Sequence, residues 1–274
     1  MTSVIDLPQD LSNAGSGGVS VEFRGISHVY GQGARKTEAL RDINFTARPG
    51  EFVALLGPSG CGKSTLLTIA AGLVRSSSGT VLIDGIPVTK PATELGFVFQ
   101  EATLLEWRTA LSNIMLQAEA RSIDRAQALK RAKELMAQTG ISGFEEAYPA
   151  QLSGGMRQRV SICRALLHNP PMLFMDEPFG ALDAMTREQM IMDTQQIWMD
   201  GRKTVLFVTH DIPEALLLAD RIVVLGARPG RILKIYEVGG GRPRAMDDLS
   251  TKRFVELQHE VRQLLREAGA FARH

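Results

Sequence analysis

The segment Gly57–Thr65 constrains the fold of this chain more than any other stretch, and it reads Gly-Pro-Ser-Gly-Cys-Gly-Lys-Ser-Thr. It follows an apolar run, Phe52–Leu56, that has the length of a buried strand, and it opens a helical run that ends near Gly72. A glycine-rich turn before a helix presents backbone N–H groups to an anion, and the helix dipole adds to that attraction. In this context the pattern G-x-x-x-x-G-K-[ST] predicts a phosphate loop, with Lys63 on the β- and γ-phosphates and Ser64 on Mg²⁺.

Nucleotide binding is the function that this loop predicts. A glycine-rich turn that carries a lysine by chance is the alternative, and the order of strand, loop and helix disfavours it. We therefore expect ATP or a similar nucleotide and Mg²⁺ as ligands. The candidate nucleotide contacts are Gly57, Pro58, Ser59, Gly60, Cys61, Gly62, Lys63, Ser64 and Thr65.

The composition is that of a globular protein, with 274 residues, 44% hydrophobic and 22% charged. The net charge of +1 and the lack of a local basic patch predict no nucleic-acid partner. Cys61 and Cys163 do not make a disulfide framework and suit a reducing compartment. We expect no signal peptide, and no apolar run approaches the roughly 18 residues of a membrane-spanning helix. Any membrane role is therefore expected to be peripheral.

The order of the elements predicts an α/β fold. Residues 1–20 are rich in Gly and Ser and predict a disordered leader. Alternating apolar positions before and after 31–36 predict an antiparallel flap, and later apolar runs predict a mostly parallel sheet. From residue 101 helical patterns replace strands, at 110–120 and 124–139, which predicts an inserted helical subdomain. The predicted units are 21–100 and 166–235 for the core with its β flap, 101–165 for the helical subdomain, and 236–274 for a C-terminal helical tail.

The end of the chain has two further patterns. Apolar runs at 221–225 and 231–235, around an Arg-Pro-Gly turn, predict two closing edge strands. Residues 250–267 then carry apolar side chains on one helical stripe, which predicts a helix docked on the chain's own body. The stripe consists of Phe254, Leu257, Val261, Leu264 and Leu265.

Two acids end the apolar run Met172–Glu177. An acid at the carboxyl end of a strand in a phosphate-loop protein is the expected partner of the metal, which assigns this role to Asp176, directly or through water. Glu177 is placed to accept a proton from the water that attacks the γ-phosphate. The alternative is a pair of acids that begins a surface loop.

Three further side chains have positions that suit a ligand site, and for each a structural reading stays open. Gln100 ends the strand-like run at 95–99 and could reach the metal or the attacking water. His210 ends the run at 204–209 and could contact the γ-phosphate. Tyr30 lies just before the phosphate loop and could stack on adenine. A surface glutamine, a strand-end histidine and an ordinary strand tyrosine are the alternatives.

A second anion site is suggested by Leu152-Ser153-Gly154-Gly155-Met156 at the start of a helical run. Ser153 can cap this helix, and the paired glycines leave its backbone N–H groups accessible. The stretch has no lysine of its own. A capped helix start with no ligand is the alternative.

From about Val21 to Arg231 the sequence resembles the ATP-binding subunits of ABC transporters, and more narrowly those of bacterial nitrate, sulfonate and taurine importers. Gly57–Thr65 matches the Walker A loop, and Leu152–Met156 matches the signature motif. Leu173–Glu177 matches Walker B. The remaining matches are Gln100 to the Q-loop, Ala181–Asp183 to the D-loop, His210 to the switch histidine and Tyr30 to the adenine-stacking aromatic.

This resemblance implies a P-loop NTPase fold of the RecA-like kind and an ATPase that powers import of a small solute. It implies a head-to-tail homodimer, in which Ser153, Gly154 and Gly155 of one copy face the ATP held by Lys63 of the other, and in which Asp183 lies near the nucleotide. It also implies polytopic membrane permease subunits, a periplasmic or lipoprotein solute-binding protein, and a place at the cytoplasmic face of the cell (inner) membrane.

Two positions depart from the subgroup's pattern. Met156 stands where the signature motif usually has glutamine, and Glu106 stands where proline is common. Neither change removes a phosphate ligand.

Two competing classes are a soluble ABC ATPase that acts in assembly, translation or DNA maintenance, and a small-molecule P-loop kinase. The lack of a coiled-coil insertion and of a basic arm argues against the first, and the second would not need Ser153–Gly155.

Overall fold

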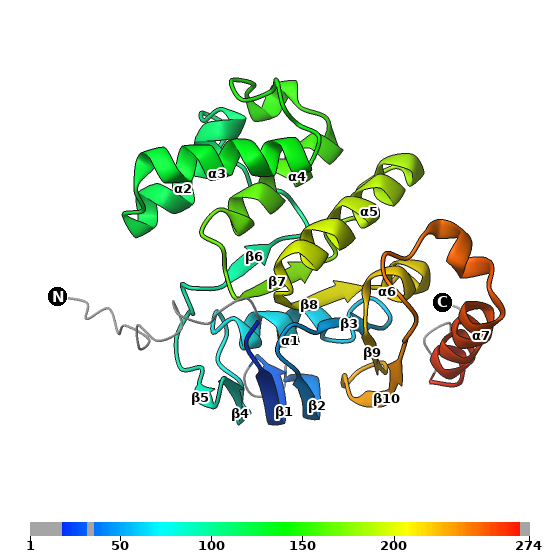
Figure 1. The fold of residues 1–274 in the computed structure, drawn as a ribbon. Coiled ribbons are helices and arrows are strands. Elements are labelled where there is room, and N and C mark those ends of the chain that lie inside the picture. The colour runs from blue at the N-terminus through cyan, green and yellow to red at the C-terminus, as the bar shows by residue number, and fades with distance from the viewer. Residues whose placement is uncertain (1–17, 32–35, 269–274) are drawn as a thin grey trace.

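The computed structural model describes residues 18–31 and 36–268, which form two sheets and a lobe of helices (Figure 1). The larger sheet has the strand order β10-β9-β3-β8-β7-β6, and all its neighbours are parallel except β10 and β9. Its strands are β3 (Phe52–Leu56), β6 (Gly96–Val98), β7 (Met172–Asp176), β8 (Thr204–Thr209), β9 (Arg221–Leu225) and β10 (Ile232–Glu237).

The central strands are apolar without alternation because helices or the second sheet cover both faces. In the register Leu56 lies opposite Thr209, and Asp176 lies opposite Val208. The carboxyl ends of β3, β7 and β8 therefore meet at one edge of the sheet. This edge is where parallel α/β sheets bind ligands.

The second sheet is antiparallel, with the order β2-β1-β4-β5. Its strands are β1 (Val21–Tyr30), β2 (Thr37–Ala47), β4 (Ser78–Ile83) and β5 (Ile86–Pro87). Helix α1 (Lys63–Ala70) lies between the two sheets, where its Leu66 and Leu67 share one apolar core with Phe23 and Phe45. The predicted α/β fold with a parallel core and an antiparallel flap is confirmed.

Helices α2 (Ala110–Arg121), α3 (Arg125–Gln138) and α4 (Gly154–Leu166) pack together at one end of the molecule (Figure 1). This is the predicted helical insertion, although the boundaries assigned to it stay a prediction. The other helices are α5 (Ala184–Gly201), α6 (Ile212–Leu218) and α7 (Lys252–Glu267), with short 3-10 turns at Pro149–Gln151 and Met246–Ser250. Within the described residues, no helix combines the length and apolar character needed to traverse a bilayer.

The ends of the chain differ in two details from the expectation. Residues 1–17 of the predicted leader lie outside the described residues, but 18–20 pack on the body: the Gly18 N–H bonds to Arg202 O at 3.1 Å, and Val19 is buried. The expectation of two edge strands was wrong for β9. It pairs with both β3 and β10, so only β10 is an edge. The apolar residues of β9 extend the central sheet, whereas those of β10 are partly exposed.

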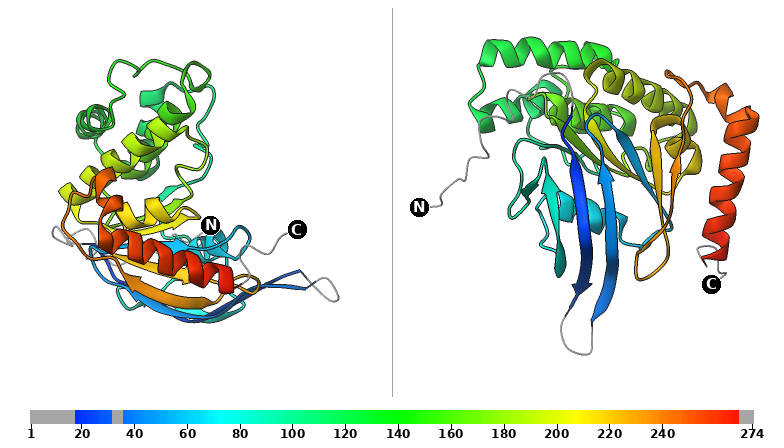
Figure 2. Two further views of the ribbon diagram at one scale, coloured as in Figure 1. Left: turned by 90° about the vertical axis from the view of Figure 1, so that its right-hand side faces the viewer. Right: turned by 60° about the horizontal axis from the view of Figure 1, so that its bottom comes forward.

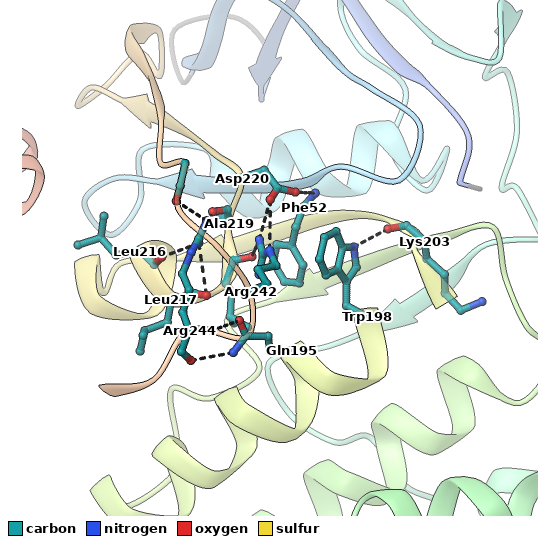
Figure 3. A network of polar contacts seen from close by, with 12 residues as sticks. Phe52, Gln195, Trp198, Lys203, Leu216, Leu217, Ala219, Asp220, Arg242 and Arg244 are labelled. Carbon is teal, nitrogen blue, oxygen red and sulfur yellow. Dashed lines mark hydrogen bonds and ion pairs between the residues drawn. The ribbon is translucent and has the colours of Figure 1, made fainter. Parts of the chain in front are cut away.

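The C-terminal segment is fixed to the body by two arginines (Figure 3). Arg244 Nη1 donates to Leu216 O at 2.8 Å and to Ala219 O at 2.7 Å, which satisfies carbonyls at the end of α6. Arg242 Nη2 lies 2.8 Å from Asp220 Oδ1. Burial lowers the pKa of Arg244 to about 10. Because a buried guanidinium needs these acceptors, the segment after β10 has a fixed path along α5 and α6.

Helix α7 stands at the side of the molecule, next to β10 (Figure 2). Phe254, Val261 and Leu265 are buried, and Leu257 and Leu264 are partly buried against the same core. The prediction that this stripe docks on the chain's own body is confirmed.

Candidate functional site

The phosphate loop follows β3 and turns directly into α1 through glycines that no other residue replaces without strain. Gly60 and Gly62 have φ of 74° and 97°, in the left-handed region. A Cβ on Gly57 would lie 2.7 Å from Leu225 O. The sequence therefore holds the loop in one shape, with the first N–H groups of α1 unpaired within the helix and directed at the loop.

Lys63 begins α1 and is only 4% exposed. Its Nζ donates to Gly57 O at 2.9 Å and to Pro58 O at 3.0 Å, and lies 3.7 Å from Glu177 Oε1. The ammonium is thus held inside the loop by carbonyls and by one acid. This is the position that the motif predicts for a cation that contacts phosphate.

Ser64 and Asp176 come together although they belong to different motifs. Ser64 Oγ donates to Asp176 Oδ1 at 2.8 Å. Burial raises the pKa of Asp176, the hydrogen bond from Ser64 opposes this effect, and the Glu177 charge adds to it. A hydroxyl and a carboxylate are the oxygen ligands that Mg²⁺ prefers. Mg²⁺ takes six oxygen ligands, so a Mg²⁺ here would need further oxygens, from a nucleotide or from water, besides these two side chains.

Glu177 follows β7 with an unusual backbone, since its φ is 42°. Its N–H still donates to Val208 O at 3.0 Å, so the neighbouring strand stabilises the turn. Its Oε2 lies 3.0 Å from His210 Nδ1. A non-glycine residue in the left-handed region costs about 1–3 kcal/mol, and such costs concentrate at functional sites. The turn places the Glu177 carboxylate between Lys63 and His210.

Tyr30 ends β1 beside the phosphate loop. Its hydroxyl is 3.1 Å from Thr65 Oγ1, and its ring packs edge-on against His28 with the centroids 4.5 Å apart. The residue is 46% exposed. The ring is thus tethered next to the loop with one part open to solvent, a placement that fits stacking on a base.

Ser153 and the two glycines after it start α4, away from the phosphate loop of the same chain. Ser153 Oγ accepts the Met156 N–H at 3.2 Å and caps the helix as predicted. Helix α4 packs against α2, α5 and β6, whereas α1 packs against β2, β7 and β8. The two glycine-rich helix starts therefore belong to different parts of the fold (Figure 1).

Asp183 and Gln100 lie outside the contact set formed by Lys63, Ser64, Asp176, Glu177 and His210. Asp183 caps α5, where its carboxylate accepts the Thr186 N–H at 3.0 Å and the Thr186 hydroxyl at 2.8 Å. These bonds lower the pKa of Asp183. The Thr186 methyl also packs closely against the start of α4, since a Cβ added to Gly155 would lie only 2.6 Å from that methyl carbon. Gln100 is exposed two residues after β6.

Two contacts of the site were not expected from the sequence. Arg228, in the turn between β9 and β10, donates through Nε to Gly60 O at 3.4 Å. Glu214, in the first turn of α6, accepts a hydrogen bond of 2.6 Å from the Thr209 hydroxyl just before His210. A charged residue in a polar turn or at a helix start gives no local signal for such a contact.

A phosphate loop and two strand-end acids, joined at the carboxyl edge of a parallel sheet, define the class of P-loop ATPases. Residues 40–180 match the sequence model of the family described as ABC transporter. The chain belongs to this family of ATP-binding proteins and is an ATPase.

Three similar proteins illustrate the match. The aliphatic sulfonates import ATP-binding protein SsuB of Bacillus cereus is 42% identical, with 92% of this chain and 98% of that protein aligned. The taurine import ATP-binding protein TauB of Shigella sonnei is 45% identical over 76% of this chain and 82% of its own length. A solved dimeric ATP-binding cassette in a post-hydrolysis state, bound to ADP and Pi, is 34% identical with a TM-score of 0.72, covering 81% of this chain and all of that one.

Proposed function

We propose that the chain is the ATP-hydrolysing subunit of an importer for a small sulfonate, taurine, nitrate or a related solute. The observation that carries the proposal is the 42% identity to a sulfonate import ATP-binding protein along 92% of the chain. The site supports it, because the charged groups expected of an ATPase converge within one cluster. A soluble ABC ATPase without a membrane partner is the weaker alternative.

Each residue of the cluster has a proposed task in hydrolysis. Lys63 and the loop N–H groups bind the β- and γ-phosphates, and Ser64 with Asp176 would hold Mg²⁺, Asp176 directly or through water. Bound Mg²⁺ would neutralise charge on the phosphate oxygens. Glu177 accepts the proton of the attacking water. His210 contacts the γ-phosphate and, through its 3.0 Å contact, keeps Glu177 in place.

Three further contacts complete the proposed nucleotide site. Gln100 would approach the metal or the attacking water from the end of β6. The ring of Tyr30 would stack on adenine. Asp183, at the start of α5, would lie near the nucleotide.

We further propose that two copies associate head to tail and clamp ATP between them. Ser153, Gly154 and Gly155 form a glycine-rich helix start far from the loop of their own chain, so they would bind the nucleotide of a second copy. The dimeric cassette bound to ADP and Pi supports this arrangement by analogy. ATP binding then favours the closed dimer, and ATP hydrolysis allows the dimer to open again.

The partners would be polytopic permease subunits and a solute-binding protein, with the chain placed at the cytoplasmic face of the membrane. The exposed residues of the helical lobe next to Gln100 are a natural contact for the permease. Trp107 is 73% exposed, which is unusual for a large aromatic side chain. Closure of the dimer would move this surface.

Reconstitution tests the proposed function. The chain is co-expressed with the membrane proteins encoded beside it, purified in detergent and placed in liposomes with the cognate binding protein. We expect ATP-dependent uptake of radiolabelled taurine, an alkanesulfonate or nitrate, and no uptake with Glu177→Gln. Recovery with ribosomes or DNA and with no membrane protein would support the soluble alternative instead.

A further inference from the structure

Glu214 is a buried acid next to the candidate site. It lies in the first turn of α6 and is 5% exposed. Its Oε2 accepts a 2.6 Å hydrogen bond from Thr209 Oγ1, and its Oε1 lies 3.8 Å from Arg187 Nε. An acid in the first helical turn is normally solvated and favoured by the helix dipole. Burial removes that solvent, so the fold must supply polar partners in its place.

The hydrogen bonds around Glu214 hold together the two ends of the turn that carries His210. The Thr209 hydroxyl, besides donating to Glu214, accepts the Asp211 N–H at 3.0 Å. The Asp211 carboxylate in turn accepts the Glu214 N–H at 2.9 Å. The residues on both sides of His210 are thus bonded to each other and to Glu214. This fixes the backbone from which His210 reaches Glu177.

Arg187 connects the same turn to α5. Its guanidinium faces Glu214 and also donates through Nη2 to Leu182 O at 3.0 Å. Leu182 directly precedes Asp183, which caps α5 through its bonds to Thr186. A single chain of contacts therefore runs from the turn of His210 to the start of α5.

We propose that Glu214 is a positioning residue for ATP hydrolysis. Its carboxylate holds the turn of His210 in the conformation that faces Glu177, and Arg187 transmits the position of the α5 start to this turn. The proposal rests on the proposed function, because Glu214 acts on the reaction only through His210 and touches no nucleotide.

The charged groups around Glu214 fit a role in coupling the start of α5 to the turn that carries His210. The pKa of Glu214 is raised to about 7, mainly by burial and to a lesser extent by the neighbouring Asp211 carboxylate. The Thr209 hydrogen bond, Arg187 and His210 act in the opposite direction. The ionised carboxylate is thus stabilised mainly by the Thr209 hydrogen bond and also by Arg187 and His210. Glutamine at this position would still accept the Thr209 hydrogen bond but would lose the ion pair.

Steady-state kinetics of the full-length protein tests this role. The variants are Glu214→Gln and Glu214→Ala, with Glu188→Gln, an exposed acid on α5, as the matched control. We expect kcat to fall by roughly 10- to 100-fold, because small displacements of catalytic groups reduce rates by factors of this size. We expect KM and the affinity for ATP to stay within about twofold, because no phosphate contact is removed. A change confined to KM or to thermal stability, with kcat as in the parent, would overturn the proposal.

A double-mutant cycle with His210→Ala separates positioning from a general structural effect. If Glu214 acts through His210, Glu214→Gln should cause little further loss of kcat in the His210→Ala background. Fully additive losses would contradict the proposal. Should Glu214→Ala fail to fold, Thr209→Val removes the same hydrogen bond, and Thr209→Ser is its control because it keeps the hydroxyl.

The same measurements distinguish this proposal from the proposed function. A parent and a Glu188→Gln variant that both hydrolyse ATP, together with a Glu214→Gln variant of equal kcat, would overturn only the role of Glu214. A parent chain that neither binds nor hydrolyses ATP would overturn both.

Discussion

Ser64 and Asp176 are 112 positions apart in the sequence, yet the Ser64 hydroxyl donates to Asp176 Oδ1 over 2.8 Å. The parallel register of β7 and β8, and of β8 and β3, produces this contact. It joins the phosphate loop to the end of the strand that carries both acids. The pair forms the proposed Mg²⁺ site.

Removing either member of this pair should weaken the use of Mg²⁺. We expect Ser64→Ala and Asp176→Asn to raise the Mg²⁺ concentration for half-maximal hydrolysis by roughly 10- to 100-fold, because removing a side chain that supports a metal site weakens metal affinity by factors of this size. The measurement is ATPase rate against free Mg²⁺. Ser78→Ala, an exposed serine of β4, is the control. Equal Mg²⁺ dependence in all four proteins would remove the metal role from this pair.

Glu177→Gln should separate binding from turnover. The amide keeps the shape of the side chain and its reach to His210 but cannot take a proton. We expect the affinity for ATP to be retained and the rate of phosphate release to fall by roughly 10² to 10⁴. Equilibrium binding and single-turnover kinetics measure the two effects. Hydrolysis at the parent rate would show that Glu177 is not the general base.

Tyr30 tests adenine stacking through a matched pair of substitutions. Tyr30→Ala removes the ring and should weaken ATP binding by about 1–3 kcal/mol, the usual contribution of stacking on a base. Tyr30→Phe keeps the ring and loses only the contact with the Thr65 hydroxyl. It should bind ATP within about twofold of the parent. If calorimetry finds parent-like affinity for Tyr30→Ala, Tyr30 is an ordinary strand residue.

Glu214 should make stability depend on pH. Its pKa is raised from 4.5 to about 7 in the folded state, so between these values the folded protein holds a proton that the unfolded chain releases. The free energy of unfolding should therefore fall as pH rises from 4.5 to 7, by at most about 1.4 kcal/mol per pH unit. Urea unfolding of the parent and of Glu214→Gln at several pH values measures the difference. Parallel pH curves for the two proteins would refute the shift.

The sequence predicted those parts of the site that lie in contiguous motifs. Lys63 and Ser64 are fixed by the glycine pattern around them. Asp176 ends one apolar strand, and Glu177 and His210 directly follow strands whose ends meet at the same sheet edge. The apolar runs do not reveal strand order, so they do not show that β9 lies between β3 and β10. Short-range patterns likewise cannot show which strand a buried run pairs with.

Contacts made by isolated charged residues could not be predicted. Glu214 looks like any acid at a helix start, and its burial depends on Thr209 and Arg187 from other elements. Arg244 lies in a polar segment rich in Gly and Pro, and its role follows only from the carbonyls of α6 around it. Both residues are explained by tertiary packing and not by local propensity.

The central claim is that ATP is bound between Lys63 of one copy and Ser153 of another. Homodimers of Lys63→Ala lack the lysine at both sites, and homodimers of Ser153→Arg block both glycine-rich helix starts. A mixed dimer of the two variants keeps one intact site, because the unaltered Lys63 and Ser153 come from opposite copies.

Mixing the two inactive variants after subunit exchange is therefore the most direct measurement. We predict that ATP hydrolysis returns in the mixture, to roughly a quarter of the parent rate if pairing is random and the sites act independently. A mixture that stays as inactive as its two components, despite demonstrated mixed dimers, would contradict the shared site.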